Sequence, residues 1–236
     1  MALLHDFFSM QGFRHSLLFQ ENHPIWEALY LLSDYLDSYH HKIEVEIPNG
    51  SFIKSKDLIS IGKGTVIDPG VFIQGPCIIG EDCEIRHGSF LRGNVILGNR
   101  CVIGNGAELK NTILMDESTA AHLCYLGDSI LGTSVNIGAG VKCANLRLDR
   151  SEVPVIIDGQ KVNTGLKKLG AILGDGVQIG CNSVLNPGTL VGKKTLIHPL
   201  LNISGTIPAY SQVKSSREWV VEPRGEKILR NLRSLQ

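Results

Sequence analysis

The stretch of sequence that decides the fold runs from Ile59 to Leu109 and reads ISIGKGTVIDPGVFIQGPCIIGEDCEIRHGSFLRGNVILGNRCVIGNGAEL. An aliphatic residue returns at every sixth position of this stretch. The nine residues are Ile61, Ile67, Ile73, Ile79, Ile85, Leu91, Leu97, Ile103 and Leu109. Given the share of aliphatic residues in an average composition, the chance of nine in register is on the order of one in ten thousand or less. A helix would repeat every three to four residues instead, and an ordinary strand every two.

The six-residue repeat continues beyond Leu109 with interruptions. It slips by one residue to Leu114, Ala120 and Leu126, and again to Leu131, Ile137 and Cys143. It pauses over about 145–170 and resumes at Leu173, Ile179, Leu185, Val191, Ile197 and Ile203. One hexapeptide is a short strand plus a tight turn, and three of them make one triangular coil with the aliphatic side chains inside. The pattern therefore predicts a mainly β protein, a left-handed parallel β-helix, which is an exception to the usual right-handed crossover.

Glycine and aromatic residues are distributed unevenly along the chain. The stretch from Ile59 to Pro208 contains 23 of the 26 glycines but three of the 14 aromatic residues. Glycine suits the tight corners of a narrow prism, whereas large aromatic rings do not fit inside it. We therefore expect a helical N-terminal extension over 1–52, a β-helix domain over 53–210 with a loop excursion at 145–170, and a helical tail over 211–236.

The flanking segments have helical patterns. Residues 23–40 predict an amphipathic helix, with Asn22 as its N-cap and Pro24 in its first turn. Its apolar stripe comprises Ile25, Leu29, Leu32 and Leu36. This helix is expected either to cap the open end of the β-helix or to pack on a neighbouring molecule. Residues 214–236 predict a second, solvated amphipathic helix.

Composition argues against several classes of protein. The formal net charge is zero, whereas a nucleic-acid binder carries a basic excess. No apolar run approaches the ~20 residues of a membrane span, and the start of the sequence lacks the basic segment of a signal peptide. The six cysteines include no Cys-x-x-Cys pair, so we expect reduced thiols in a cytoplasmic protein.

The residues that depart from the repeat are densest after Ala121. They read His122-Leu-Cys-Tyr125-Leu-Gly-Asp128, then Asn136-Ile-Gly-Ala139-Gly, then Asn145. This series resembles the acetyltransferase domain of the bifunctional bacterial enzyme that joins glucosamine-1-phosphate N-acetyltransferase to N-acetylglucosamine-1-phosphate uridylyltransferase. It is also similar to the C-terminal domain of archaeal sugar-1-phosphate nucleotidylyltransferases. The resemblance covers roughly Ile59 to Pro208.

The resemblance implies roles for individual residues. The catalytic group would be His122 as the base, Glu108 as the carboxylate that orients it, and Ala139, whose backbone N–H meets the acetyl carbonyl. The substrate-binding group would be Arg92 and Lys110 for the phosphate, Tyr125 and Asn136 for the sugar, and Lys168 or Lys167 on the loop. The acetyl-CoA group would be Ala139, Asn145, Cys181 and Pro199. Cys181 and Pro199 stand where the bacterial enzyme has Ser and Ala.

The implied activity is transfer of acetyl from acetyl-CoA to the amine of an amino-sugar 1-phosphate, with glucosamine-1-phosphate favoured, during UDP-N-acetylglucosamine synthesis. A neutral imidazole can take the proton that the amine loses, and a backbone N–H can hold the oxyanion that forms. No metal is required for this chemistry. The family also implies a homotrimer with the substrate pocket between subunits, where Lys168 would act on a neighbour's site. Because the chain has no Gly-rich nucleotide loop, we expect a separate nucleotidylyltransferase to make the UDP-sugar.

Three alternatives remain open. The first is a β-helix carbonic anhydrase, whose zinc would be held by His87, His122 and His198. The second is a non-catalytic assembly or regulatory partner of a separate sugar nucleotidylyltransferase. The third keeps acyl transfer but changes the acceptor, to galactosamine-1-phosphate or another amino-sugar phosphate or nucleotide, or changes the acyl chain.

Overall fold

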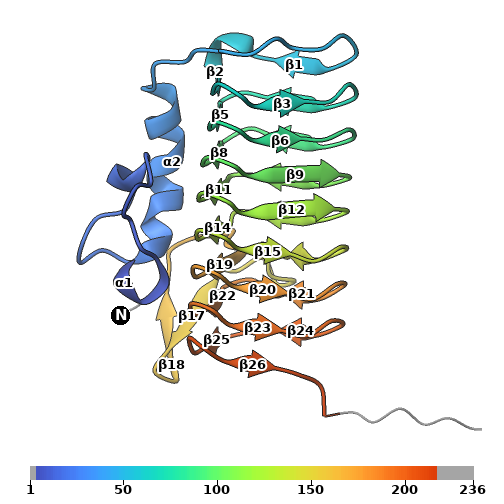
Figure 1. Ribbon diagram of the computed structural model, residues 1–236. Helices are drawn as coiled ribbons and strands as arrows, with labels where there is room; N and C mark the ends of the chain where they lie inside the picture. The colour runs from blue at the N-terminus through green and yellow to red at the C-terminus, as the bar shows by residue number, and fades with distance from the viewer. Residues whose placement is uncertain (1–3, 217–236) are drawn as a thin grey trace, which may run out of the picture.

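The computed structural model describes residues 4–216, and Figure 1 shows a narrow column of stacked coils. Each coil contributes one short strand to each of three parallel sheets, and each sheet contains eight strands. The three sheets are the faces of a prism. The predicted left-handed parallel β-helix is confirmed.

Each face is named here by its strands, in their order along the column. Face 1 consists of β1 (Phe52–Lys54), β4 (Phe72–Gln74), β7 (Phe90–Arg92), β10 (Glu108–Lys110), β13 (Tyr125–Gly127), β16 (Lys142–Cys143), β21 (Val184–Leu185) and β24 (Asn202–Ile203). Face 2 consists of β2 (Ile59–Ile61), β5 (Cys77–Ile79), β8 (Val95–Leu97), β11 (Thr112–Leu114), β14 (Ile130–Leu131), β19 (Ala171–Leu173), β22 (Thr189–Val191) and β25 (Thr206–Ile207). Face 3 consists of β3 (Val66–Ile67), β6 (Glu84–Ile85), β9 (Val102–Asn105), β12 (Thr119–His122), β15 (Asn136–Ile137), β20 (Gln178–Ile179), β23 (Leu196–Ile197) and β26 (Gln212–Val213).

The hexad aliphatics form the core of the prism. On face 1, Leu91 pairs with Leu109 and Leu109 pairs with Leu126 in the next coil. All three are fully buried. The phase slips come from one corner: two residues join β7 to β8, but Asn111 alone joins β10 to β11. The coil is therefore one residue shorter at this corner, and the inward aliphatic residues still stack on those of the neighbouring coils.

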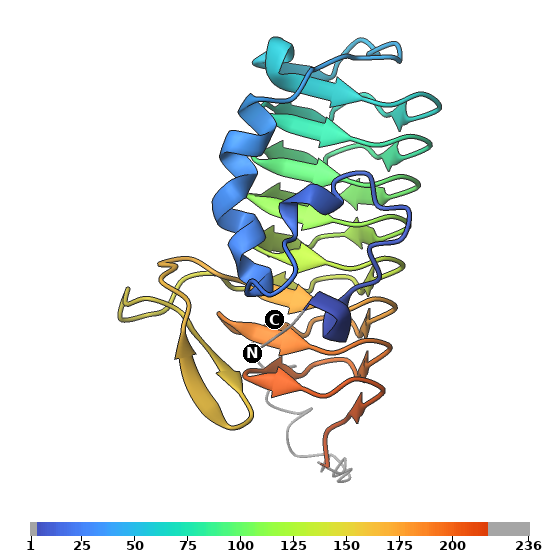
Figure 2. The ribbon, with the colours of Figure 1, turned by 90° about the vertical axis from the view of Figure 1, so that its left-hand side faces the viewer.

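The N-terminal extension packs against the side of the prism, on face 2. Its helical elements are α1 (Leu4–Phe7), η1 (Ser16–Leu18), η2 (Ile25–Glu27) and α2 (Ala28–Asp37), and a further turn, η3 (Lys56–Leu58), precedes β2. Leu29, Leu32 and Leu36 are buried in one cluster with outward residues of face 2. Those face-2 residues are Ile78, Ile96, Ile113, Ile130, Ile172 and Leu190. Figure 2 shows α2 running along the column.

Two parts of the helix prediction are therefore wrong. The helix covers a side face of its own chain, where isoleucines point outward in successive coils and are buried with the helix stripe; it caps no open end. Asn22 has a φ of 69° and caps no helix, and the helix begins instead through the turn at Ile25–Glu27. The predicted apolar stripe itself is buried as expected.

The loop excursion leaves the column after Cys143 and returns before Ala171. It carries an antiparallel hairpin, β17 (Pro154–Ile157) and β18 (Gln160–Asn163). Tyr30 Oη of the extension donates a hydrogen bond to Thr164 O, 3.2 Å away, so the extension also supports the excursion. Of the predicted C-terminal helix, residues 217–236 lie outside the described part of the chain. Within residues 4–216, no helix is long and apolar enough to cross a membrane.

Candidate functional site

His122 lies on the edge where face 3 turns into face 1, in a stack of tight turns. Leu123 N donates to Asn105 O above it (2.8 Å), and Gly140 N donates to His122 O below it (3.1 Å). Asn182 N then donates to Ala139 O (2.8 Å), and Leu200 N to Cys181 O (3.0 Å). These bonds place four predicted residues in successive coils of one edge, which we call the edge column: His122, Ala139, Cys181 and Pro199.

The edge column offers polar groups to solvent. The His122 side chain is exposed and forms no hydrogen bond or ion pair with any described residue. The Ala139 N–H likewise has no acceptor among residues 4–216. Cys181 is the exposed thiol of the chain, whereas the other five cysteines are buried. A base and a free N–H one coil apart could serve proton transfer and oxyanion stabilisation at one centre.

A second group of predicted residues lies on the outer surface of face 1. Glu108 is in register with Phe90 above and Tyr125 below. Its carboxylate accepts a hydrogen bond from Arg92 Nη1 at 2.5 Å, in a half-exposed ion pair. The Arg92 guanidinium also lies over the Phe90 ring, 5.8 Å from its centroid. The predicted bond between Glu108 and His122 is absent from the described structure, where the Glu108 carboxylate is paired with Arg92 instead.

Asp128 organises the remaining polar residues of this face. Asp128 is 4% exposed, and its carboxylate accepts hydrogen bonds from Lys110 Nζ at 3.0 and 3.2 Å and from Asn111 Nδ2 at 2.9 Å. Asn145 Nδ2 donates to Asp128 as well, and to Tyr125 Oη at 3.3 Å. Burial raises the pKa of the Tyr125 phenol, and the negative charge of Asp128 raises it further. We call Arg92, Glu108, Lys110, Tyr125, Asp128 and Asn145 the face-1 cluster.

Gly127 makes room for this cluster. A Cβ at this position would lie 2.6 Å from Asn145 Nδ2 and 2.6 Å from Tyr125 Oη. The phenol and the amide therefore occupy the space above the glycine. Asn145, predicted to contact acetyl-CoA, is thus held among the residues predicted to bind the sugar.

The remaining predicted residues lie near these two groups. Asn136 projects from face 3, in register with Thr119 and Gln178. Lys167 and Lys168 are exposed at the returning end of the excursion. The next residue, Leu169, donates its N–H to Asn145 O (3.0 Å), and Gly170 donates to Asp128 O (2.8 Å). The backbone that follows the loop lysines is therefore held beside the face-1 cluster of the same chain.

The three histidines of the zinc alternative are spread along the column. His87 is two coils from His122, because Asn105 lies between them and donates its side-chain N–H to His87 O. His198 Nε2 lies 2.7 Å from Gln212 Nε2, several coils away. Within the described residues, no three His, Cys, Asp or Glu side chains are arranged to hold a metal ion.

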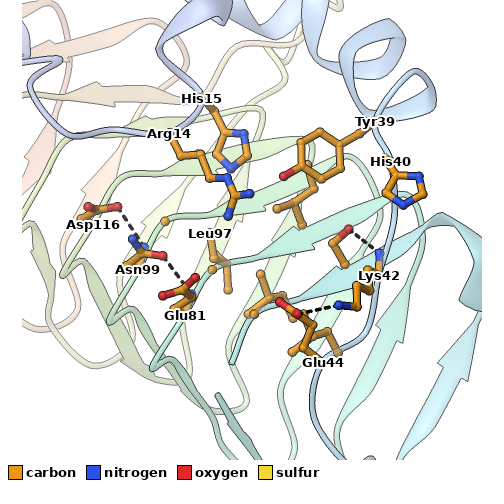
Figure 3. Close-up of a pocket in the computed structure, with 17 residues that line it drawn as sticks. Arg14, His15, Tyr39, His40, Lys42, Glu44, Glu81, Leu97, Asn99 and Asp116 are labelled. Carbon is orange, nitrogen blue, oxygen red and sulfur yellow. Dashed lines mark hydrogen bonds and ion pairs between the residues drawn. The ribbon is translucent and has the colours of Figure 1, made fainter. Parts of the chain in front are cut away.

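A cavity of about 250 Å³ lies on the other side of the molecule, between the N-terminal extension and the first coils. Arg14 and Tyr39 point into it, and Glu81 lies on the wall opposite (Figure 3). Its upper wall includes His15, which is buried and hydrogen-bonded to Tyr35 Oη at 2.8 Å. Burial, and secondarily the charge of Arg14, lowers the pKa of His15 to about 4. The predicted site residues do not line this cavity.

Sequence reasoning missed the part played by Asp128, Asn111 and Gly127. A signal was available, since Gly127 and Asp128 close the histidine motif. The pairing of a buried carboxylate with Lys110 depends on the coil register, which the phase slip at Asn111 determines.

Several known proteins have sequences similar to this chain. The sequence profile of the family described as "GMPPB C-terminal domain" matches residues 73–202. A bifunctional sugar-1-phosphate nucleotidylyltransferase/acetyltransferase of Sulfurisphaera tokodaii is 41% identical over 87 residues, covering 37% of this chain and 22% of that protein. The bifunctional protein GlmU of Methanococcus vannielii is 36% identical over 112 residues, covering 48% and 27%. The predicted resemblance is confirmed, although this chain spans only about a quarter of the length of these two relatives.

A third relative matches along most of its length. The uncharacterized acetyltransferase YaiX of Escherichia coli O6:K15:H31 is 31% identical over 179 residues, which cover 75% of this chain and 78% of that protein. With more than half of its length matched by one family profile, the chain belongs to the family of the GMPPB C-terminal domain.

Proposed function

We propose that this chain transfers acetyl from acetyl-CoA to the amine of an amino-sugar 1-phosphate, with glucosamine-1-phosphate as the preferred acceptor. The observation that carries the proposal is the edge column, where the exposed His122 stands one coil above the free N–H of Ala139. One relative is named a bifunctional sugar-1-phosphate nucleotidylyltransferase/acetyltransferase and another an acetyltransferase, which supports the same class of reaction.

The proposed reaction uses few groups. The imidazole of His122 takes a proton from the acceptor amine as the amine nitrogen attacks the thioester carbon. The N–H of Ala139 donates to the oxygen of the tetrahedral intermediate, which is negative only at that stage. The new C–N bond remains as the C–S bond breaks, and the proton on His122 passes to the departing thiolate.

The proposed binding roles follow the two groups of residues. Tyr125, Asn136 and Lys168, or Lys167 in its place, contact the sugar, and Arg92 and Lys110 face its phosphate. Asn145, Cys181 and Pro199 lie toward acetyl-CoA, with Asn145 at the boundary because its amide is bonded to Tyr125 and Asp128. The product would be used in UDP-N-acetylglucosamine synthesis by a separate nucleotidylyltransferase in the cytoplasm.

The residues proposed to bind the acceptor lie on both sides of one prism edge. Asn136 belongs to face 3, whereas Arg92, Lys110 and Tyr125 belong to face 1. One small acceptor cannot contact both outer surfaces of a single column, so we propose a homotrimer in which neighbouring columns bring the two surfaces together. Face 2 is covered by the chain's own extension, which leaves faces 1 and 3 and their shared edge for this contact.

The test is release of CoA thiol with acetyl-CoA and a panel of amino-sugar phosphates. We expect His122→Ala to lower kcat/KM for the preferred acceptor by about 10²–10⁴-fold, the usual worth of a general base. His87→Ala is the matched control, since His87 is exposed on the same edge two coils away. Equal activity of the two variants would contradict the role of His122.

One observation favours a second candidate, the non-catalytic assembly or regulatory partner of a nucleotidylyltransferase. In the described structure, Glu108 is paired with Arg92 and no carboxylate orients His122. If the wild-type chain releases no thiol with any acceptor, but binds a sugar nucleotidylyltransferase and changes its rate, this second function replaces the first.

A further inference from the structure

Both predicted phosphate-binding cations on face 1 already have acidic partners. Arg92 is paired with Glu108, and Lys110 is paired with the buried Asp128. The two pairs together carry no net charge. A phosphate that approached them would meet two carboxylates as well as two cations, so the pairs alone provide little attraction for an anionic acceptor.

Lys142 is the next outward residue on the same face. It follows Tyr125 directly in the strand register, and Cys143 beside it points into the core. Lys142 is exposed, and it forms no ion pair with any of residues 4–216. Face 1 therefore presents an uncompensated positive charge one coil below the phenol that is proposed to contact the sugar.

The ammonium group of Lys142 extends toward the edge column. Its Nζ donates a hydrogen bond to Gly140 O at 2.6 Å, and Gly140 N in turn donates to His122 O. The Cys124 thiol is bonded to the same two turns, at His122 O and Gly138 O. Burial raises its pKa, and backbone hydrogen bonds and, less strongly, the charge of Lys142 act against that rise. The side chain thus starts beside Tyr125 and ends beside the turn that holds Ala139.

A lysine ammonium has three donors, and a carbonyl oxygen that accepts one of them does not neutralise the charge. The other donors of Lys142 remain for a ligand. An oxyanion placed there would lie between Tyr125 and the edge column, with its charge met by a cation that no acidic side chain shares.

We propose that Lys142 binds the anionic group of the acceptor and thereby determines the preference for a phosphorylated amino sugar. The inference rests on the proposed function and changes one assignment in it: the anionic group of the acceptor contacts Lys142, which lies two coils from Lys110 and three from Arg92, in place of those two paired cations. Lys142 acts here as a specificity-determining residue, and the proton chemistry stays with His122.

The experiment compares glucosamine-1-phosphate with unphosphorylated glucosamine, using the full chain. Lys142→Gln keeps an N–H donor but removes the charge, and Lys142→Arg restores the charge. Lys54→Gln is the matched control, because Lys54 is an exposed lysine on the outer surface of face 1 in the first coil. The readouts are the dissociation constant of each sugar by calorimetry without acetyl-CoA, and kcat/KM by thiol release.

We expect Lys142→Gln to weaken binding of glucosamine-1-phosphate about tenfold, as for the loss of one charge-assisted hydrogen bond. The preference for the phosphorylated over the unphosphorylated acceptor should fall by the same factor, and Lys142→Arg should recover most of it. Lys54→Gln should bind like the wild type.

Two contrary results can be told apart. If the wild type binds and acetylates glucosamine-1-phosphate but Lys142→Gln binds it equally well, the inference about Lys142 is wrong and the proposed function stands. If the wild type neither binds nor acetylates any amino-sugar phosphate, the proposed function fails, and the inference is overturned with it.

Discussion

Replacing Gly127 by alanine tests the geometry of the face-1 cluster with one methyl group. Gly127 has no φ in the left-handed region, so its backbone accepts a side chain. The new Cβ would lie 2.6 Å from both Tyr125 Oη and Asn145 Nδ2. Since non-bonded heavy atoms normally stay at least about 3.5 Å apart, each group must retreat by about 1 Å.

The displacement of Tyr125 and Asn145 should lower the free energy of unfolding. The bond between Tyr125 and Asn145 is already 3.3 Å long, and a further 1 Å would break it, while the bond from Asn145 to the buried Asp128 would be distorted. Losing one or two such bonds lowers the free energy of unfolding by about 1–3 kcal/mol. For a chain of this length, where 1 kcal/mol corresponds to about 2–4 °C, we expect the melting temperature to fall by about 2–12 °C. If the proposed function is correct, a displacement of about 1 Å should also lower kcat/KM by about 100-fold.

The assay is thermal unfolding of Gly127→Ala in two backgrounds. In the wild-type background we expect the loss just given. In a Tyr125→Leu/Asn145→Ala background the obstructing atoms are gone, so Gly127→Ala should cost less than about 0.5 kcal/mol or even stabilise, as alanine restricts the unfolded chain. A wild-type melting temperature for Gly127→Ala in the native background would refute the reasoning.

Two further predictions concern the N-terminal extension. Leu32→Ala should cost about 2–5 kcal/mol, because Leu32 is fully buried between α2 and face 2; hydrogen exchange should show faster exchange in α2 than in the coils, and uniform acceleration would contradict this. Because burial lowers the pKa of His15 from its ordinary 6.5 to about 4, the unfolded chain takes up the proton first as the pH falls. The stability from neutral His15 should therefore be complete above about pH 6.5 and be lost toward pH 4, by up to about 3 kcal/mol. Urea midpoints measured over this range should vary less for His15→Gln than for the wild type, and parallel curves would rule the effect out.

Much of the fold follows from the period of six, because each inward aliphatic must stack on its equivalent in the next coil. The position of α2 could not be predicted in the same way. Its apolar stripe predicts that the stripe is buried, but not which surface buries it. The partner surface was nonetheless present in the sequence as Ile78, Ile96 and Ile113, outward residues on every third strand. An aliphatic run recurring once per coil predicts which face is covered.

The candidate site was less completely predictable. The histidine motif brings His122 and Ala139 to one edge, because the coil register is set by the repeat. The partner of Glu108 was not predictable, since Arg92 and His122 are both within one coil of it and the choice depends on side-chain geometry. The sequence likewise gave no indication that Lys142 reaches across to Gly140, because that contact depends on the shape of a turn.

The extension that runs along face 2 also changes how the column can unfold. In a solenoid, each coil contacts only its neighbours, so terminal coils can open one at a time and the transition is gradual. Here one helix of ten residues, about 15 Å long, contacts coils that do not touch one another. Phe7 O and Ser9 N are further bonded to Asp175, far down the column. Opening any one of these coils disturbs a contact shared with the others, so the middle of the column should unfold as one cooperative unit.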